Sequence, residues 1–255
     1  MRSMFSGLEG IRAEFLAAGD VDAIECMEYV LDCEAGSSPK LFPNSPYPRD
    51  CGTDGKLLPE RTAPNGGGMT LLDFCTHPHS QTAQLDPTHV AALRIYSTAA
   101  FAAINAPMRD PKRRQRGSPH PLPLTTALLR DAVGKLRAVG AQSDVANLEI
   151  DLWRGMHDVR IVDAFVADGG TELAPMSTTA DVKVAIQYAV GRECTLMRLR
   201  TRSSMERGAD IAYLSAFPSE DECLFPPLTY LQPVSQSTAE IGGLTFRIIT
   251  VEPRM

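Results

Sequence analysis

The stretch Ile150-Asp151-Leu152-Trp153-Arg154-Gly155 marks the position at which the pattern of this chain changes. Apolar residues recur at helical spacing before it, and short β-prone segments bounded by turn residues follow it. Helices in the first part and strands in the second predict an α+β fold with an antiparallel sheet. We expect strands at residues 150–154, 159–166, 195–201, 211–215, 222–225 and 244–251.

Capping residues and apolar spacing predict the helices. Asp20 is typical of a helix N-cap, and Asp86 followed by Pro87 is typical of a helix start. Gly19 and Gly140 suit helix ends, because glycine readily adopts the backbone conformation found there. We expect helices over residues 8–18, 21–31, 87–96 and 128–139, and one more over 178–190 within the strand half.

Two segments rich in proline interrupt the helices. Residues 34–69 hold six of the 19 prolines and six of the 19 glycines, and a loop of this length usually indicates either function or disorder. Residues 110–123 carry a cluster of four basic side chains, which we interpret as a solvent-exposed loop. The four are Lys112, Arg113, Arg114 and Arg116.

The composition excludes several classes of protein. Of the 255 residues, 44% are hydrophobic and 22% are charged, as in ordinary globular proteins. The 25 basic and 31 acidic residues give a net charge of −6, which argues against nonspecific nucleic-acid binding. No apolar run approaches the ~18 residues of a membrane span. We therefore expect neither a nucleic-acid partner nor a membrane partner.

The N-terminal residues and the cysteines bear on the compartment in which the protein works. Glu9, Arg12 and Glu14 lie where a secretory signal has its apolar stretch, so we expect no Sec-type signal. Six cysteines without a CxxC pair favour reduced thiols in a reducing compartment over a disulfide framework or a zinc site. His77-Pro78-His79 lacks further ligands nearby, and we expect no bound metal.

Three short segments in the strand half combine polar side chains with strand ends. They are Arg154-Gly155, Ser177-Thr178-Thr179 and Glu220-Asp221-Glu222. Each has a simpler interpretation by itself: a surface arginine on an edge strand, a helix N-cap, and an exposed acidic turn. Their order and spacing along one chain favour a shared functional site.

This combination resembles the mono-ADP-ribosyltransferases of the arginine–serine–glutamate class. The resemblance covers residues 85–251, and it departs from the family at Thr179, where a second serine is usual. It implies split antiparallel β-sheets with a helical N-terminal part, and NAD as the co-substrate without a metal. The flanking matches are residues 93–96, 104–109, 184–189 and 223–227.

The resemblance implies a role for each residue around NAD. Glu222 would stabilise the positive charge that develops on the ribose, and Ser177 would bond to Glu222 and hold its rotamer. Arg154 would bind the pyrophosphate, because its guanidinium makes paired, charge-assisted hydrogen bonds. Gly155 would let the backbone approach nicotinamide closely, and Thr178 would join the NAD-binding residues.

Two further residues would serve the acceptor of the ADP-ribosyl group. Glu220 would orient or deprotonate it, and Phe217 lies where the family's substrate-recognition loop carries an aromatic residue. An alternative for Phe217 is that Ala216-Phe217-Pro218 packs an apolar turn against the core. A second acid at Glu220 is typical of arginine-modifying members, but a hydroxyl acceptor needs a general base even more.

The sequence therefore predicts an NAD-dependent transferase that modifies a host protein. Residues 1–84 match nothing in the general family and are expected to recognise the target, with residues 85–255 as the catalytic core. Analogy suggests a secreted bacterial effector that acts in the host cytosol, with a threonine of ubiquitin as a candidate acceptor. Three alternatives stay open: an NAD glycohydrolase, an arginine-specific transferase and a non-catalytic binding module.

Overall fold

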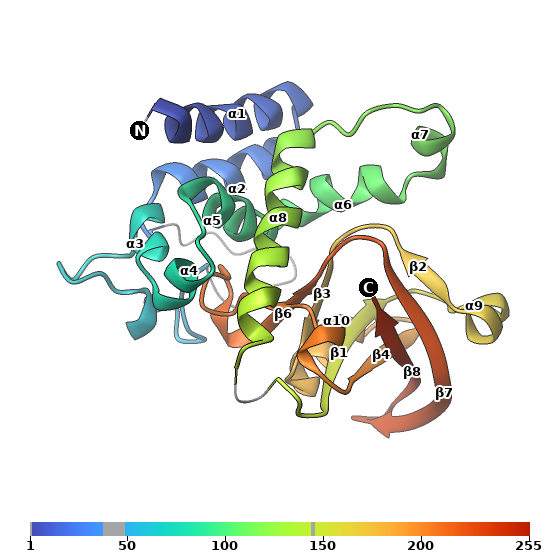
Figure 1. Cartoon of the computed structure of the whole chain (residues 1–255). Helices are drawn as coiled ribbons and strands as arrows, with labels where there is room; N and C mark the ends of the chain where they lie inside the picture. Colours follow the sequence, from blue (N-terminus) through green and yellow to red (C-terminus); the bar gives the residue numbers. More distant parts are fainter. Residues whose placement is uncertain (1, 38–48, 144–145) are drawn as a thin grey trace. The chain divides into compact units, whose positions relative to one another are not determined.

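The computed structural model describes residues 2–37, 49–143 and 146–255 (Figure 1). The chain divides into two compact units: a helical unit of residues 1–139 and 212–219, and a sheet unit of residues 140–211 and 220–255. The predicted division at 84/85 falls inside the helical unit, and the target-recognition role of residues 1–84 stays a prediction. Within the loop expected at 34–69, residues 38–48 lie outside the described residues.

The helical unit begins with helices whose starts follow from the sequence. Asp20 accepts a hydrogen bond from the Ala23 amide and caps α2, and Asp86 forms a capping box with His89 at the start of α5. Both predicted caps are confirmed. The helices are α1 (Arg2–Ala18), α2 (Val21–Asp32), η1 (Pro59–Arg61), α3 (Leu71–Cys75), α4 (Pro78–Thr82), α5 (Pro87–Tyr96), α6 (Phe101–Arg109), α7 (Pro111–Gln115) and α8 (Pro123–Gly140).

The core of the helical unit is built around α5, because all ten of its residues are buried. A helix that is buried on every side takes contacts from several neighbours, and here α1, α2, α3 and α6 pack against it. The basic segment after α6 instead forms the short helix α7, in which Lys112 and Arg114 are exposed. The prediction that this segment is solvent-exposed is confirmed, whereas the prediction of a loop is wrong over residues 111–115.

The sheet unit holds one mostly antiparallel sheet. Among the described residues it has eight strands in the order β2-β7-β8-β4-β1-β3-β6-β5, and β4 pairs with β8 in parallel. The α+β fold class is confirmed. Its elements are β1 (Ile150–His157), α9 (Asp163–Asp168), β2 (Gly170–Glu172), β3 (Met176–Thr179), α10 (Val182–Ala189), β4 (Cys194–Thr201), η2 (Ser204–Glu206), β5 (Ala209–Asp210), β6 (Glu222–Phe225), β7 (Thr229–Ile241) and β8 (Leu244–Arg254).

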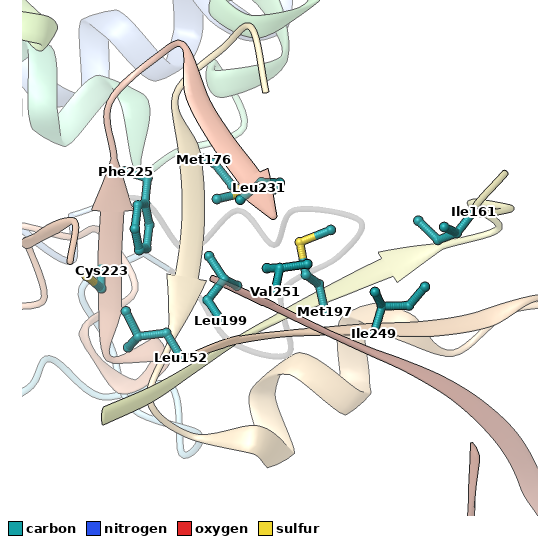
Figure 2. Close-up of a cluster of buried hydrophobic side chains, with 10 residues drawn as sticks. All are labelled: Leu152, Ile161, Met176, Met197, Leu199, Cys223, Phe225, Leu231, Ile249 and Val251. Carbon is teal, nitrogen blue, oxygen red and sulfur yellow. The ribbon is translucent and has the colours of Figure 1, made fainter. Parts of the chain in front are cut away.

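Apolar residues cover both faces of this sheet. One face carries the cluster drawn in Figure 2, which includes Met197 and Leu199 of β4. Cys194 and Leu196 alternate with them along the strand and therefore point to the opposite face, where they pack with Ala185 of α10. Burial on both faces fixes the register of β4, because a slip of one residue would exchange its two faces.

Three further predictions of local structure are wrong. Residues 159–166 do not form a strand: α9 begins at Asp163, and Phe165 and Val166 pack against the core from this helix. Residues 211–215 form a turn, because buried arginines rather than a neighbouring strand bind their carbonyl groups. The helix expected at 178–190 starts at Val182, since residues 178–179 belong to β3.

Candidate active site

Arg154 lies on β1, an interior strand between β4 and β3, so the edge-strand alternative is wrong. The strand pairs with β4 along its whole length, and it pairs with β3 where Trp153 lies opposite Thr179. One position further along, the Arg154 Nη1 atom donates to the Ser177 carbonyl oxygen at 2.7 Å. The arginine side chain thus links β1 to β3 and brings a cation to the strand that carries Ser177.

Ser177 of β3 and Glu222 of β6 contact each other across these two paired strands. In the β3–β6 register Thr179 lies opposite Glu222, and Ser177 lies two residues earlier on the same face. The Ser177 Oγ atom donates to Glu222 Oε1 at 2.6 Å, and Glu222 is only 6% exposed. The exposed-turn alternative is therefore wrong for Glu222. A buried carboxylate is costly, and the hydroxyl both lowers that cost and fixes the rotamer.

Thr178 points to the opposite face of β3 from Ser177. Its Oγ1 atom donates to the Cys223 carbonyl oxygen at 2.8 Å, and the side chain is buried. The structure therefore does not bring this hydroxyl to the Ser177–Glu222 pair, and the predicted contact with NAD stays a prediction. The N-cap of α10 is Asp181, so capping of this helix does not explain the hydroxyl triplet.

Glu220 forms a hydrogen bond with a residue for which no role in the site was predicted. The Tyr188 hydroxyl of α10 donates to Glu220 Oε1 at 2.7 Å. Burial raises the pKa of Glu220 to about 7; the hydrogen bond from Tyr188 opposes this shift, and the charge of Glu222 adds to it. A carboxylate with this pKa exchanges a proton near neutral pH, as a general base must.

Gly155 explains how Tyr188 reaches its position. A Cβ atom at residue 155 would lie 2.0 Å from the Ala185 carbonyl oxygen and 2.8 Å from the Ala189 nitrogen. Only glycine therefore lets the backbone of α10 lie directly on β1. The spacing of Ala185, Tyr188 and Ala189 along one helix face is the signal that could have identified Tyr188. The expected approach of Gly155 to nicotinamide stays a prediction.

Phe217 belongs to the helical unit. The residue is 6% exposed and forms a small buried apolar cluster with Ala216. In this structure the ring packs as the alternative interpretation expects, and a role in recognising the acceptor stays a prediction.

Two other features lie apart from the predicted site residues: an open hollow and a group of stacked aromatic rings. An open hollow of about 420 Å³ in the helical unit is lined by none of the predicted site residues. His77 stacks on Tyr213 with ring centres 4.3 Å apart, and His79 meets the same ring edge-on. Over residues 2–37, 49–143 and 146–255, no group of three or more His, Cys, Asp or Glu side chains could hold a metal ion. The hollow is lined by Phe101, Ala102, Asn105, Ala106, Arg109 and Asp110.

In the described part of the chain, no helix has the length and apolar character needed to cross a membrane.

Known proteins resemble this chain in structure rather than in sequence. No protein-family model matches it, and no curated protein sequence does. The ADP-ribosyltransferase HopU1 of Pseudomonas syringae pv. tomato DC3000 superposes with a TM-score of 0.52 at 17% identity, covering 73% of this chain and 88% of that one. Plx2a, an ADP-ribosyltransferase toxin from Paenibacillus larvae, gives 0.51 at 14% identity, covering 72% and 95%.

A third similar structure was solved with NAD. C3stau2 from S. aureus gives a TM-score of 0.50 at 14% identity and covers 68% of this chain and 91% of that one. The chain therefore has the ADP-ribosyltransferase fold, and the fold implied by the sequence resemblance is confirmed. At these identities the likeness establishes the fold alone, so the activity has to be argued from the residues.

Proposed function

We propose that this protein is an NAD-dependent mono-ADP-ribosyltransferase that modifies a side chain of another protein. The observation that carries the proposal is the buried Glu222 carboxylate, held by Ser177 at 2.6 Å. Structural packing does not require a buried carboxylate on a sheet, and such a group is a candidate for function. C3stau2, a protein of the same fold, has a crystal structure with NAD.

The residues of the site fit NAD by their chemistry. NAD supplies the ADP-ribosyl group and gives up nicotinamide. Glu222 offers a fixed negative charge where positive charge develops on the ribose, so its interaction strengthens in the transition state. Arg154 offers a guanidinium for a phosphate group, and Ser177 holds the carboxylate in its rotamer. None of these three tasks requires a metal ion.

Glu220 narrows the class of acceptor. A hydroxyl group must lose a proton as its oxygen bonds to the ribose, and a carboxylate whose pKa is about 7 can accept that proton near neutral pH. We therefore favour a hydroxyl acceptor over a guanidinium, and a threonine of ubiquitin is the first candidate. An arginine acceptor and water remain the alternative outcomes of the test.

We also propose that the protein is a secreted effector or toxin that acts on a host protein. Plx2a, which shares the fold, is a bacterial toxin, and HopU1 comes from a bacterium as well. The place of action is part of the proposal, because the residues of the site do not bear on it.

The test compares nicotinamide release with the labelling of proteins. The chain is incubated with labelled NAD alone, with purified ubiquitin, and with a eukaryotic cell lysate, and the modified residue is mapped by mass spectrometry. We expect a labelled hydroxyl residue and faster nicotinamide release when the acceptor is present. Equal release without any labelled protein would instead identify an NAD glycohydrolase, and labelled arginine would reassign the acceptor.

A further inference from the structure

The segment Ala212–Ser219 is bound through its backbone by two buried arginines of the helical unit. The Arg61 Nη2 atom donates to the Ala212 and Ser215 carbonyl oxygens at 2.8 and 3.0 Å. The Arg94 Nη1 atom donates to the Leu214 carbonyl oxygen at 2.8 Å. Because these bonds go to carbonyl groups, they fix the path of the backbone whatever side chains the segment carries.

One carboxylate holds both arginines. Asp50 is fully buried and accepts from Arg61 Nε at 3.2 Å and from Arg94 Nη2 at 2.9 Å, and the Tyr29 hydroxyl also donates to it. The Asp50 amide donates to the Ala216 carbonyl oxygen at 2.6 Å. We call Asp50, Arg61, Arg94 and Tyr29 the Asp50 cluster.

Burial makes the geometry of this cluster specific. A guanidinium out of water is stable only when its donors are paired, and Asp50 together with the three carbonyl groups supplies those partners. The segment is therefore part of the network that compensates the buried charges. Outside the cluster, the Ser97 Oγ atom accepts from the Ala216 amide at 2.9 Å, which adds a neutral contact to the same segment.

The sequence position of the segment gives the network a role beyond stability. Ser219 is joined directly to Glu220, the residue that we propose receives the acceptor's proton, and Phe217 lies within the segment. We propose that the Asp50 cluster sets the path of Ala212–Ser219 and that Arg61 is thereby a positioning residue for modification of the acceptor. This inference rests on the proposed function. On this proposal, Tyr29, Asp50 and Arg61, which belong to residues 1–84, help to position the segment that precedes Glu220.

The test uses Arg61→Lys, which keeps the positive charge beside Asp50. Arg61 binds Asp50 through Nε and the two carbonyl groups through Nη2, whereas lysine presents its three N–H donors from a single nitrogen, so it cannot reproduce this spaced pattern of bonds. The matched control is Glu14→Gln, because Glu14 accepts hydrogen bonds from the Leu124 and Thr125 amides at the start of α8, in the same unit. Both changes weaken hydrogen bonds to the backbone within the helical unit, but only the first affects the segment.

Three measurements are made on the full chain: hydrogen exchange of the peptide 212–219, nicotinamide release without acceptor, and labelling of the acceptor. For Arg61→Lys we expect faster exchange, labelling that falls about tenfold or more, and nicotinamide release within about threefold of the wild type. Glu14→Gln should leave the exchange and the ratio of the two activities unchanged. Unchanged exchange in Arg61→Lys, or a parallel fall of both activities, would overturn the proposal.

A second variant and the exchange data separate failure to fold from failure of the proposal. If Arg61→Lys does not fold, Ser97→Ala removes the single bond to the Ala216 amide; the proposal then requires faster exchange at that amide and a fall in labelling of a few-fold. If the wild type shows no labelling of any acceptor, the proposed function fails. The exchange data still decide whether the cluster holds the segment.

Discussion

The two units of this molecule each bury a carboxylate, and they do so differently. Asp50 of the helical unit is held between the guanidinium groups of Arg61 and Arg94. Glu222 of the sheet unit accepts a hydrogen bond from the Ser177 hydroxyl. Two cations bind Asp50, whereas the hydrogen bond that Ser177 donates to Glu222 comes from a neutral hydroxyl group, which orients a carboxylate. We propose that the charge of Asp50 serves folding and that the charge of Glu222 serves the reaction.

The largest effect should come from Glu222→Gln. This change keeps the shape of the side chain but removes the charge, so nicotinamide release should fall by about 10²–10³-fold. The stability should not fall, because a neutral amide is cheaper to bury than a carboxylate. Enzyme kinetics and a thermal melt measure the two quantities. Nicotinamide release within threefold of the wild-type rate would contradict the assignment of Glu222 to the active site.

Asp50→Asn makes the same chemical change in the other unit, with the opposite result expected. It leaves Arg61 and Arg94 buried beside a neutral group, and the free energy of unfolding should fall by about 3 kcal/mol. Nicotinamide release without acceptor, corrected for the folded fraction, should stay within about threefold of the wild type. Denaturant titration gives the stability. A loss of turnover as large as that of Glu222→Gln would end the distinction between the two carboxylates.

Glu220→Gln should separate transfer from hydrolysis. Labelling of the acceptor should fall about a hundredfold, because the general base is lost, while nicotinamide release without acceptor is retained. In the wild type, labelling should rise with pH through about 7, as the carboxyl group loses its proton. A pH profile of both activities checks this. A parallel loss of both would show that Glu220 supports Glu222.

The same carboxyl group links stability to pH. The pKa of Glu220 is higher in the folded protein than its usual value of 4.5, so protonation of this side chain stabilises the fold. This contribution to the free energy of unfolding is complete at pH values below 4.5 and is lost as the pH rises through about 7. Glu220→Gln does not titrate, so it should be more stable than the wild type at pH 8. No such gain is expected at pH 4, where both side chains are neutral. Melting temperatures at the two pH values test the sign.

Ser177→Ala should have a smaller effect than either charge change. It removes the bond that orients Glu222 but leaves the carboxylate in place, so nicotinamide release should fall about tenfold with little change in the KM for NAD. Ser177→Thr keeps a hydroxyl and should restore part of the rate. A variant as inactive as Glu222→Gln would mean that Ser177 does more than orient its neighbour.

The smallest change expected is that of Tyr188→Phe. The hydrogen bond from Tyr188 opposes the raised pKa of Glu220, so its loss should move the rise of acceptor labelling to higher pH. The maximal rate should change little. Overlaid pH profiles of acceptor labelling by the two proteins measure the shift. Coincident profiles would show that Tyr188 does not influence the pKa of Glu220.

The sequence predicted what depends on neighbours in the chain. The caps at Asp20 and Asp86 rest on hydrogen bonds to amides three residues away, and β6 was predicted with its observed bounds of 222–225. The long strand β7 was missed, because most of its middle residues are polar and exposed and give no buried pattern. Its stability comes from pairing with β8, which no local pattern records.

The parts of the site that escaped prediction depend on tertiary contacts. The order of Arg154, Ser177 and Glu222 along the chain predicted a shared site, and the sheet brings Ser177 to both of the others. The pairing of Tyr188 with Glu220 could not be read in the same way, because it requires α10 to lie on Gly155. The turn at residues 211–215 likewise depends on arginines more than 100 positions earlier.

The parallel pairing of β4 with β8 has a consequence for how the protein folds. Leu196 lies opposite Ile248, so the two partners are separated by 248 − 196 = 52 positions. Pairings between distant residues form slowly, because the intervening chain must be ordered before the contact stabilises anything. During synthesis, one edge of β4 stays open until β8 has been made, and an open edge can pair with another chain. Late closure of this edge therefore exposes the sheet unit to aggregation during folding.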